Sequence, residues 1–217
     1  MNFLGHYYFD RQLQNPLFNT GLSLPDLFTT FNRKWRIRHI NAADAPTIKV
    51  RFLTEGCCTH LESDRKFHQS SFFNTQGKML KELLKKYQFD KLPFRPFFLS
   101  HILLELLVDR ILMKKFPDLL PLYYTDLEKV TQQQMAALQD FLGFSNIDGF
   151  WKFFKRFREH QFLFNYQNNK DFTTSINHIF SRVKQPVIQG AYYTVFSQLL
   201  SEAEMRLTPE VLNIQHL

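Results

Sequence analysis

Apolar residues recur at helical spacing along almost every long segment of this chain. Val50, Leu53 and Leu61 follow such a period, and so do Met79 and Leu83. No segment alternates convincingly between apolar and polar residues, and no Asn-Gly hairpin turn is present. The sequence therefore predicts an all-α protein rather than one built around a sheet.

The limits of the expected helices are set mainly by prolines and capping residues. We expect helices at 24–31, 47–69, 75–87, 95–116, 131–142, 147–164, 172–183 and 188–206. The segment 95–116 is apolar almost all round, which is typical of a central, buried helix. Thr131 followed by Gln134 resembles a capping box, which marks the start of a helix.

Phenylalanine is unusually common: 25 of the 217 residues are Phe and only 7 are Gly. This balance favours a core of helices separated by bulky rings. No apolar run approaches the about 18 residues that a membrane span needs, and the opening residues do not read as a signal peptide. Adjacent cysteines such as Cys57 and Cys58 rarely form a disulfide with each other. We therefore expect a soluble cytoplasmic protein.

Polar residues interrupt two of the predicted helices at intervals of four. The first group is His60, Asp64 and His68, and the second is His101, Glu105 and Asp109. A step of four keeps each group on one helix face, and two facing helices can combine such groups into a metal site. Imidazole and carboxylate ligands suit Mn, Fe, Co or Zn, which lower the pKa of bound water. The same spacing also occurs on solvated faces paired with Lys or Arg, so both interpretations stay open.

The net charge of +7 favours an acidic partner, and the basic residues cluster at 33–38, 85–86 and 152–158. Scattered solvated lysines explain this charge equally well. The Phe residues within 152–158 recur at helical spacing, which favours core packing over binding to a nucleic acid. The chain also lacks a G-x-S-x-G nucleophile turn, a phosphate-binding loop, a dinucleotide fingerprint and an H-E-x-x-H zinc helix.

Four segments of the first half carry a resemblance to a known family. They are 1–6 (M-N-F-L-G-H), 21–28 with Gly21 and Asp26, 56–64 with Gly56, His60 and Asp64, and 99–103 with His101. These segments resemble M-N-F-L-A-H, G-N-x-x-A-D-F, G-x-x-x-H-R-x-I-D and Y-D-H-x-L of the acyl carrier protein phosphodiesterase (acyl carrier protein hydrolase) family, helical relatives of the HD phosphohydrolases. The chain departs from these motifs at Leu22, Leu61, His68 and Ser100, where the family has Asn, Arg, Asp and Asp.

The resemblance implies a single HD-domain-like bundle of helices over 1–217, in which 1–116 carries the site and 117–217 completes or covers the core. It implies a phosphodiesterase of lipid metabolism (fatty acid biosynthesis) that releases 4′-phosphopantetheine from holo acyl carrier protein, with Mn, or else Fe or Zn. The expected metal ligands are His6, Asp26, His60, Asp64, His101 and Glu105. Of these, Asp26, His60, Asp64 and His101 are also expected to be catalytic.

Further residues have expected roles around that site. Glu105 and His68 are expected to position the ligands or carry a proton, and Lys34, Arg36 and Arg38 to contact phosphate or the acidic carrier protein. Two other classes remain open: a non-catalytic helical binding protein on the same scaffold, and a helical-bundle iron protein with its ion between the two polar groups.

Overall fold

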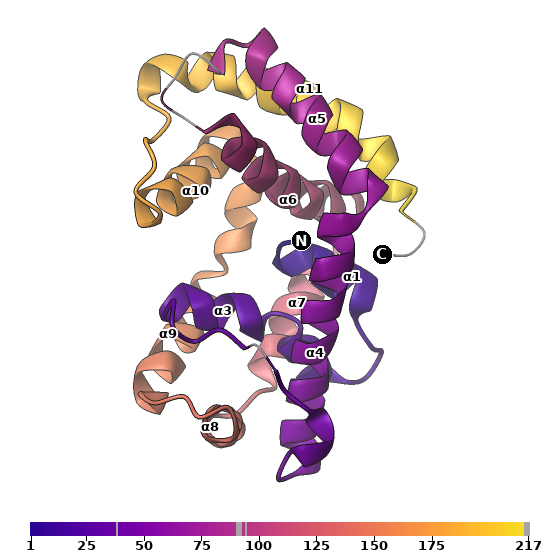
Figure 1. Cartoon of the computed structure of the whole chain (residues 1–217), viewed down its shortest axis with the longest axis vertical. Helices are drawn as coiled ribbons and strands as arrows, with labels where there is room; N and C mark the ends of the chain where they lie inside the picture. Colours follow the sequence, from indigo (N-terminus) through magenta and orange to yellow (C-terminus); the bar gives the residue numbers. More distant parts are fainter. Residues whose placement is uncertain (38, 90–92, 94, 215–217) are drawn as a thin grey trace. The chain divides into compact units, whose positions relative to one another are not determined.

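The computed structural model describes residues 1–37, 39–89, 93 and 95–214. Within these ranges the regular elements are helices and no strand is present (Figure 1). This confirms the all-α prediction. No helix in the described ranges is long and apolar enough to cross a membrane.

The chain forms two compact units, and each combines segments that are distant in sequence. Unit 1 consists of Met1–Asn2, Phe67–Phe116 and Leu163–Leu217, and unit 2 of Phe3–Lys66 and Pro117–Phe162. Residues 117–217 therefore contribute to both units.

Unit 2 combines several short helices with most of one long helix. It contains α1 (Phe3–Asp10), α2 (Pro16–Gly21), α3 (Leu24–Phe31), η1 (Ala42–Asp44), α7 (Leu119–Glu128), α8 (Gln132–Phe141), α9 (Ile147–His160) and most of α4 (Ile48–Gln69). Helix α7 packs against α1, α2 and α9, and α3 packs against α9. Aromatic rings fill this core: Phe28 lies 4.7 Å from Phe150, and Trp35 stacks on Phe144 at 4.8 Å between ring centroids.

Two glycines allow α2 and α4 to approach each other closely. A Cβ atom on Gly56 would lie 2.1 Å from the Phe18 carbonyl oxygen, and one on Gly21 would lie 2.3 Å from the Leu53 carbonyl oxygen. No residue larger than glycine fits at either position without moving the backbone. Because Gly21 ends α2, this contact places the following residue, Leu22, against α4.

Unit 1 is built around the buried helix α6 (Pro96–Lys115). It also contains α5 (Ser71–Lys86), α10 (Asn169–Arg182), η4 (Gly190–Tyr192), α11 (Tyr193–Leu212), the end of α4 and most of η3 (Phe162–Gln167). Helix α6 packs against α5 and α11 and is buried on nearly all sides, as its sequence predicts. Carboxylates of α11 join these helices: Glu204 binds Arg110 Nε at 3.0 Å, and Glu202 binds Lys86 Nζ at 2.6 Å.

Most predicted helix limits are correct to within a few residues, and the capping box at Thr131 and Gln134 is confirmed. The prediction for 147–164 is wrong at its end, because Gln161 takes a left-handed conformation (φ 43°) that stops α9 at His160. The prediction for 188–206 is also wrong, since α11 begins at Tyr193 and continues through Pro209 to Leu212. The short helices α1, α2 and α7 were not predicted.

Candidate functional site

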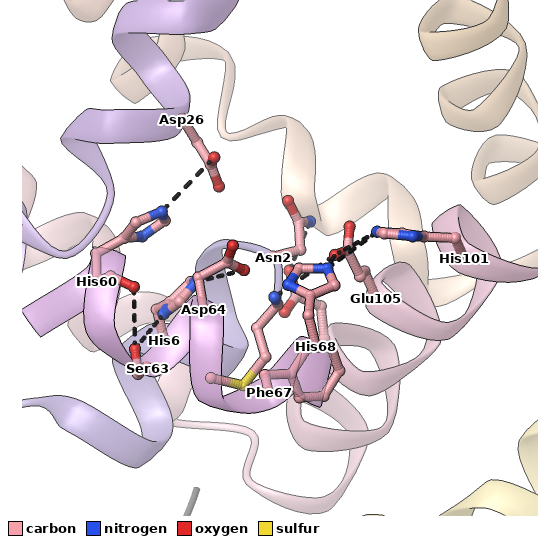
Figure 2. Close-up of polar contacts among 12 residues, drawn as sticks. Asn2, His6, Asp26, His60, Ser63, Asp64, Phe67, His68, His101 and Glu105 are labelled. Carbon is pink, nitrogen blue, oxygen red and sulfur yellow. Dashed lines mark hydrogen bonds and ion pairs between the residues drawn. The ribbon is translucent and has the colours of Figure 1, made fainter. Parts of the chain in front are cut away.

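The residues expected to form one site lie in two groups, one in each unit. His6, Asp26, His60 and Asp64 belong to unit 2, whereas His101 and Glu105 belong to unit 1 together with His68. We call the first group, with Asp10 and Ser63, the histidine-pair cluster, and His68, His101 and Glu105 the triad (Figure 2).

Three helices supply the histidine-pair cluster. Helix α1 carries His6 and Asp10 one turn apart, α3 carries Asp26 in its first turn, and α4 carries His60, Ser63 and Asp64. The two imidazole rings stack with centroids 3.9 Å apart and planes inclined by 31°. Both rings are buried, with His6 0% and His60 4% exposed.

The main chain fixes the orientation of His60. Its Nδ1 lies 2.7 Å from the Leu22 carbonyl oxygen, which only accepts hydrogen bonds, so Nδ1 is the donor. In the neutral ring the lone pair is then on Nε2, which lies 3.7 Å from Asp26 Oδ1. The close contact of Gly21 with α4 brings the Leu22 carbonyl to this position.

Side chains fix the orientation of His6 in a similar way. Its Nδ1 lies 3.1 Å from Ser63 Oγ and 3.5 Å from Asp10 Oδ2. Ser63 Oγ donates its proton to the His60 carbonyl oxygen at 3.3 Å and therefore accepts from His6 Nδ1. Nε2 of His6 lies 3.8 Å from Asp64 Oδ1.

The carboxylates around the two rings differ in their exposure to solvent. Burial raises the pKa of Asp10, although Ser63 and His60 counteract part of this effect. Asp26 and Asp64 are more open, with side chains 38% and 35% exposed. The cluster thus has a buried side that holds the rings and an exposed side that carries two carboxylates.

The triad brings three donor atoms into mutual contact. His68 Nε2, His101 Nε2 and Glu105 Oε1 lie 3.1 Å from one another in all three pairs (Figure 2). Helix α6 carries His101 and Glu105 one turn apart, and His68 comes from the end of α4. Within the described residues, this is the only group of three or more His, Cys, Asp or Glu side chains close enough together to hold one metal ion.

Burial alone would raise the pKa of Glu105, but its neighbours reverse this effect. The Met1 amino group, 3.5 Å from Oε1, and the hydrogen bonds from His101 and His68 together lower the pKa below its usual range. Glu105 is therefore a carboxylate at neutral pH. Asp109, the third residue of the predicted group on this helix, is not part of the triad: its Oδ2 accepts a hydrogen bond from Asn2 Nδ2 at 2.8 Å.

The basic residues expected to bind substrate belong to unit 2. Lys34 and Arg36 are exposed, and Arg36 lines a pocket of about 460 Å³ beside His39, Asn41 and Phe144. Arg38 lies outside the described residues.

Sequence reasoning missed the residues that orient the rings. Sequence spacing could have indicated two of them. Ser63 follows His60 by three residues and Asp10 follows His6 by four, so each pair lies on one helix face. Spacing does not indicate Leu22, because it contributes a main-chain carbonyl that every residue type has.

Compared with models of protein families, with curated proteins and with solved structures, the chain gives no match.

Proposed function

We propose that this protein is a metal-dependent phosphodiester hydrolase whose reaction takes place at the histidine-pair cluster. One observation carries the proposal: each of two buried imidazoles has its Nδ1 held by an acceptor of the chain and its Nε2 facing a partly exposed carboxylate. Metal-binding histidines in proteins are oriented in this way, by a hydrogen bond at the other ring nitrogen.

The donor set fits a divalent ion such as Mn²⁺, Fe²⁺ or Zn²⁺. The two histidines offer imidazole nitrogen and the two aspartates offer carboxylate oxygen. His6 Nε2 lies 3.8 Å from Asp64 Oδ1, and His60 Nε2 lies 3.7 Å from Asp26 Oδ1. When bound, such an ion lowers the pKa of a coordinated water and so supplies a nucleophile near neutral pH. In this proposal the four residues hold the ion between them, although their donor atoms are spread more widely than the three of the triad.

The remaining groups act by orientation. The Leu22 carbonyl and Ser63 prevent rotation of the rings, so both Nε2 atoms stay directed at the two carboxylates. Asp26 and Asp64 are exposed enough to meet a substrate at the surface of unit 2 and to accept a proton from water. His101 and Glu105, which were also predicted to join this set, belong to unit 1 and have no part in the proposal.

The proposed substrate is the phosphodiester of an acidic holo acyl carrier protein. The family resemblance of the segments that contain His6, Asp26, His60 and Asp64 supports it, and so does the net charge of +7. Unit 2 also exposes basic residues suited to an acidic surface: Lys34, Arg36, Lys152, Lys155 and Arg156.

Mass spectrometry of the carrier protein tests the proposal. The full chain, freed of metal and then supplied with Mn²⁺, Fe²⁺ or Zn²⁺, should convert holo to apo carrier protein, and chelation should stop the reaction. Asp26→Asn should lower the rate by about 10²–10⁴-fold, whereas Asp118→Asn, at an exposed aspartate of the same unit, should leave it unchanged. No conversion by the wild-type chain with any of these ions would refute the proposal.

A further inference from the structure

The triad in unit 1 has a geometry that hydrogen bonding alone does not explain. Its three contacts join two imidazole nitrogens and one carboxylate oxygen, each 3.1 Å from the other two. Each Nε2 carries at most one proton and the carboxylate carries none, so hydrogen bonds can serve at most two of the three contacts. With Glu105 as a carboxylate, at least one pair meets lone pair to lone pair or proton to proton in every protonation state of the two rings.

A single metal ion satisfies all three contacts together. Ligand atoms about 2.1 Å from an ion are about 3.0 Å apart at the octahedral angle and about 3.4 Å apart at the tetrahedral angle. The observed 3.1 Å lies between these values. The three donors therefore already occupy one face of a coordination sphere.

Aromatic rings of the same unit hold the two imidazoles in place. The Phe73 ring lies 4.8 Å from that of His68 and 5.1 Å from that of His101, both edge-on, and Phe67 contacts His68 and Phe73 at 5.5 and 5.3 Å. An apolar wall of this kind limits ring rotation and lowers the local dielectric, which strengthens the attraction between a cation and Glu105. The opposite side is open, since His68 and His101 are 28% and 29% exposed.

We propose that His68, His101 and Glu105 bind one divalent first-row transition ion, at a site separate from the histidine-pair cluster. Two imidazoles and one carboxylate without a thiolate suit Fe²⁺, Co²⁺ or Zn²⁺ better than Ca²⁺ or Mg²⁺, which prefer oxygen. Three protein ligands on one face leave further coordination positions for water or a small anionic ligand. The proposal does not depend on hydrolysis of a phosphodiester.

Cobalt binding to the metal-free full chain tests this site. Co²⁺ titration followed by its visible absorption counts the bound ions and gives their affinities. Each of the variants His68→Asn, His101→Asn and Glu105→Gln loses one ligand, so the affinity for one equivalent of Co²⁺ should fall. The decrease should exceed the about 10–100-fold that follows loss of a hydrogen-bond partner outside the coordination sphere. His178→Asn, at an exposed histidine of α10 in the same unit, should bind as the wild type does.

A second measurement on the wild-type chain guards against variants that fail to fold. With ¹⁵N-labelled histidine, Zn²⁺ should shift the Nε2 resonances of His68 and His101 and leave those of His178 in place. Unchanged resonances of His68 and His101 at saturating Zn²⁺, or triad variants that bind Co²⁺ with wild-type stoichiometry and affinity, would overturn the proposal. Because the readout is metal binding, failure of the proposed hydrolase does not decide this result.

Discussion

The His6–His60 pair of unit 2 and the His68–His101 pair of unit 1 consist of the same residue type, each pair with carboxylates nearby, yet their donor atoms are arranged differently. In unit 2 the chain holds the Nδ1 atoms, and the carboxylates remain 3.7 and 3.8 Å from Nε2. In unit 1 the Nε2 atoms and the carboxylate oxygen form a triangle with 3.1 Å sides. The chain thus fixes ring orientation in the first case and brings three donor atoms into mutual contact in the second.

The rings also differ in burial, and this difference matches the two proposals. His6 and His60 are almost completely buried, and the most exposed side chains of their cluster are those of Asp26 and Asp64. All three triad side chains are partly exposed. Two groups of the same residue types therefore differ in how far their rings are exposed to solvent.

The largest expected effect comes from paired variants that separate the two groups. His60→Ala should lower hydrolysis of the carrier phosphodiester by about 10²–10⁴-fold and leave Co²⁺ binding at the triad unchanged. His68→Ala should abolish that Co²⁺ binding and keep the rate within about threefold of wild type, as for a site outside the chemistry. Rate assays and metal titrations on the same preparations check both statements. Loss of both properties in either variant would contradict two separate sites.

The close contact of α2 and α4 provides the next largest effect. In Gly56→Ala, the added Cβ meets the Phe18 carbonyl oxygen, so we expect a loss of about 2–3 kcal/mol in the free energy of unfolding. Gly77→Ala is the matched control: it lies within α5, its Cβ meets nothing within 4 Å, and it should stabilise the chain by about 0.5–1 kcal/mol. Circular dichroism during urea unfolding measures both variants, and the fluorescence of Trp35 and Trp151, which belong to unit 2, reports the effect of Gly56→Ala separately. Equal stability of the two variants would refute the close approach.

A smaller effect is expected at Ser63, which positions His6. Ser63→Ala removes the acceptor 3.1 Å from His6 Nδ1, so the ring is less well fixed and hydrolysis should fall by about 10–100-fold. Ser63→Thr keeps a hydroxyl and should restore most of the rate. Metal titration of the triad should give wild-type values for both variants. An unchanged rate in Ser63→Ala would show that Asp10 alone orients His6.

Local chemistry made much of the fold predictable from the sequence. The helix at 24–31 is predicted to the residue, and the helix that follows Thr131 begins with the capping box that the sequence indicates. The end of α9 could not be predicted, because a left-handed Gln161 has no signature in residue type. Helices α1 and α2 are short and depend on packing within unit 2 rather than on their own periodicity.

The candidate site was less predictable than the fold. Spacing of four correctly placed His101 and Glu105 on one face of a buried helix, and it indicated His68 as a partner. It did not indicate that residues 60–64 and 68 of one helix serve different units, because that division depends on contacts between segments far apart in sequence. It also did not indicate the role of the Leu22 carbonyl, since main-chain acceptors leave no trace in the choice of side chain.

The smallest expected effect is on the acid stability of unit 1. Ion pairs connect the helices of this unit, whereas close packing connects α2 and α4 in unit 2. Hydrogen bonds from Lys86, Tyr87 and Arg206 lower the pKa of Glu202 from 4.5 to about 2. A lowered folded-state pKa stabilises the fold above pH 4.5, and this contribution is lost as the pH falls toward 2. Glu202→Gln should therefore unfold at slightly lower temperature than wild type at neutral pH, and the difference should vanish near pH 2. Circular dichroism should report this difference in unfolding temperature, and the fluorescence of Trp35 and Trp151 in unit 2 should report a smaller one. An equal difference at neutral pH and near pH 2 would exclude the charge of Glu202 as its cause.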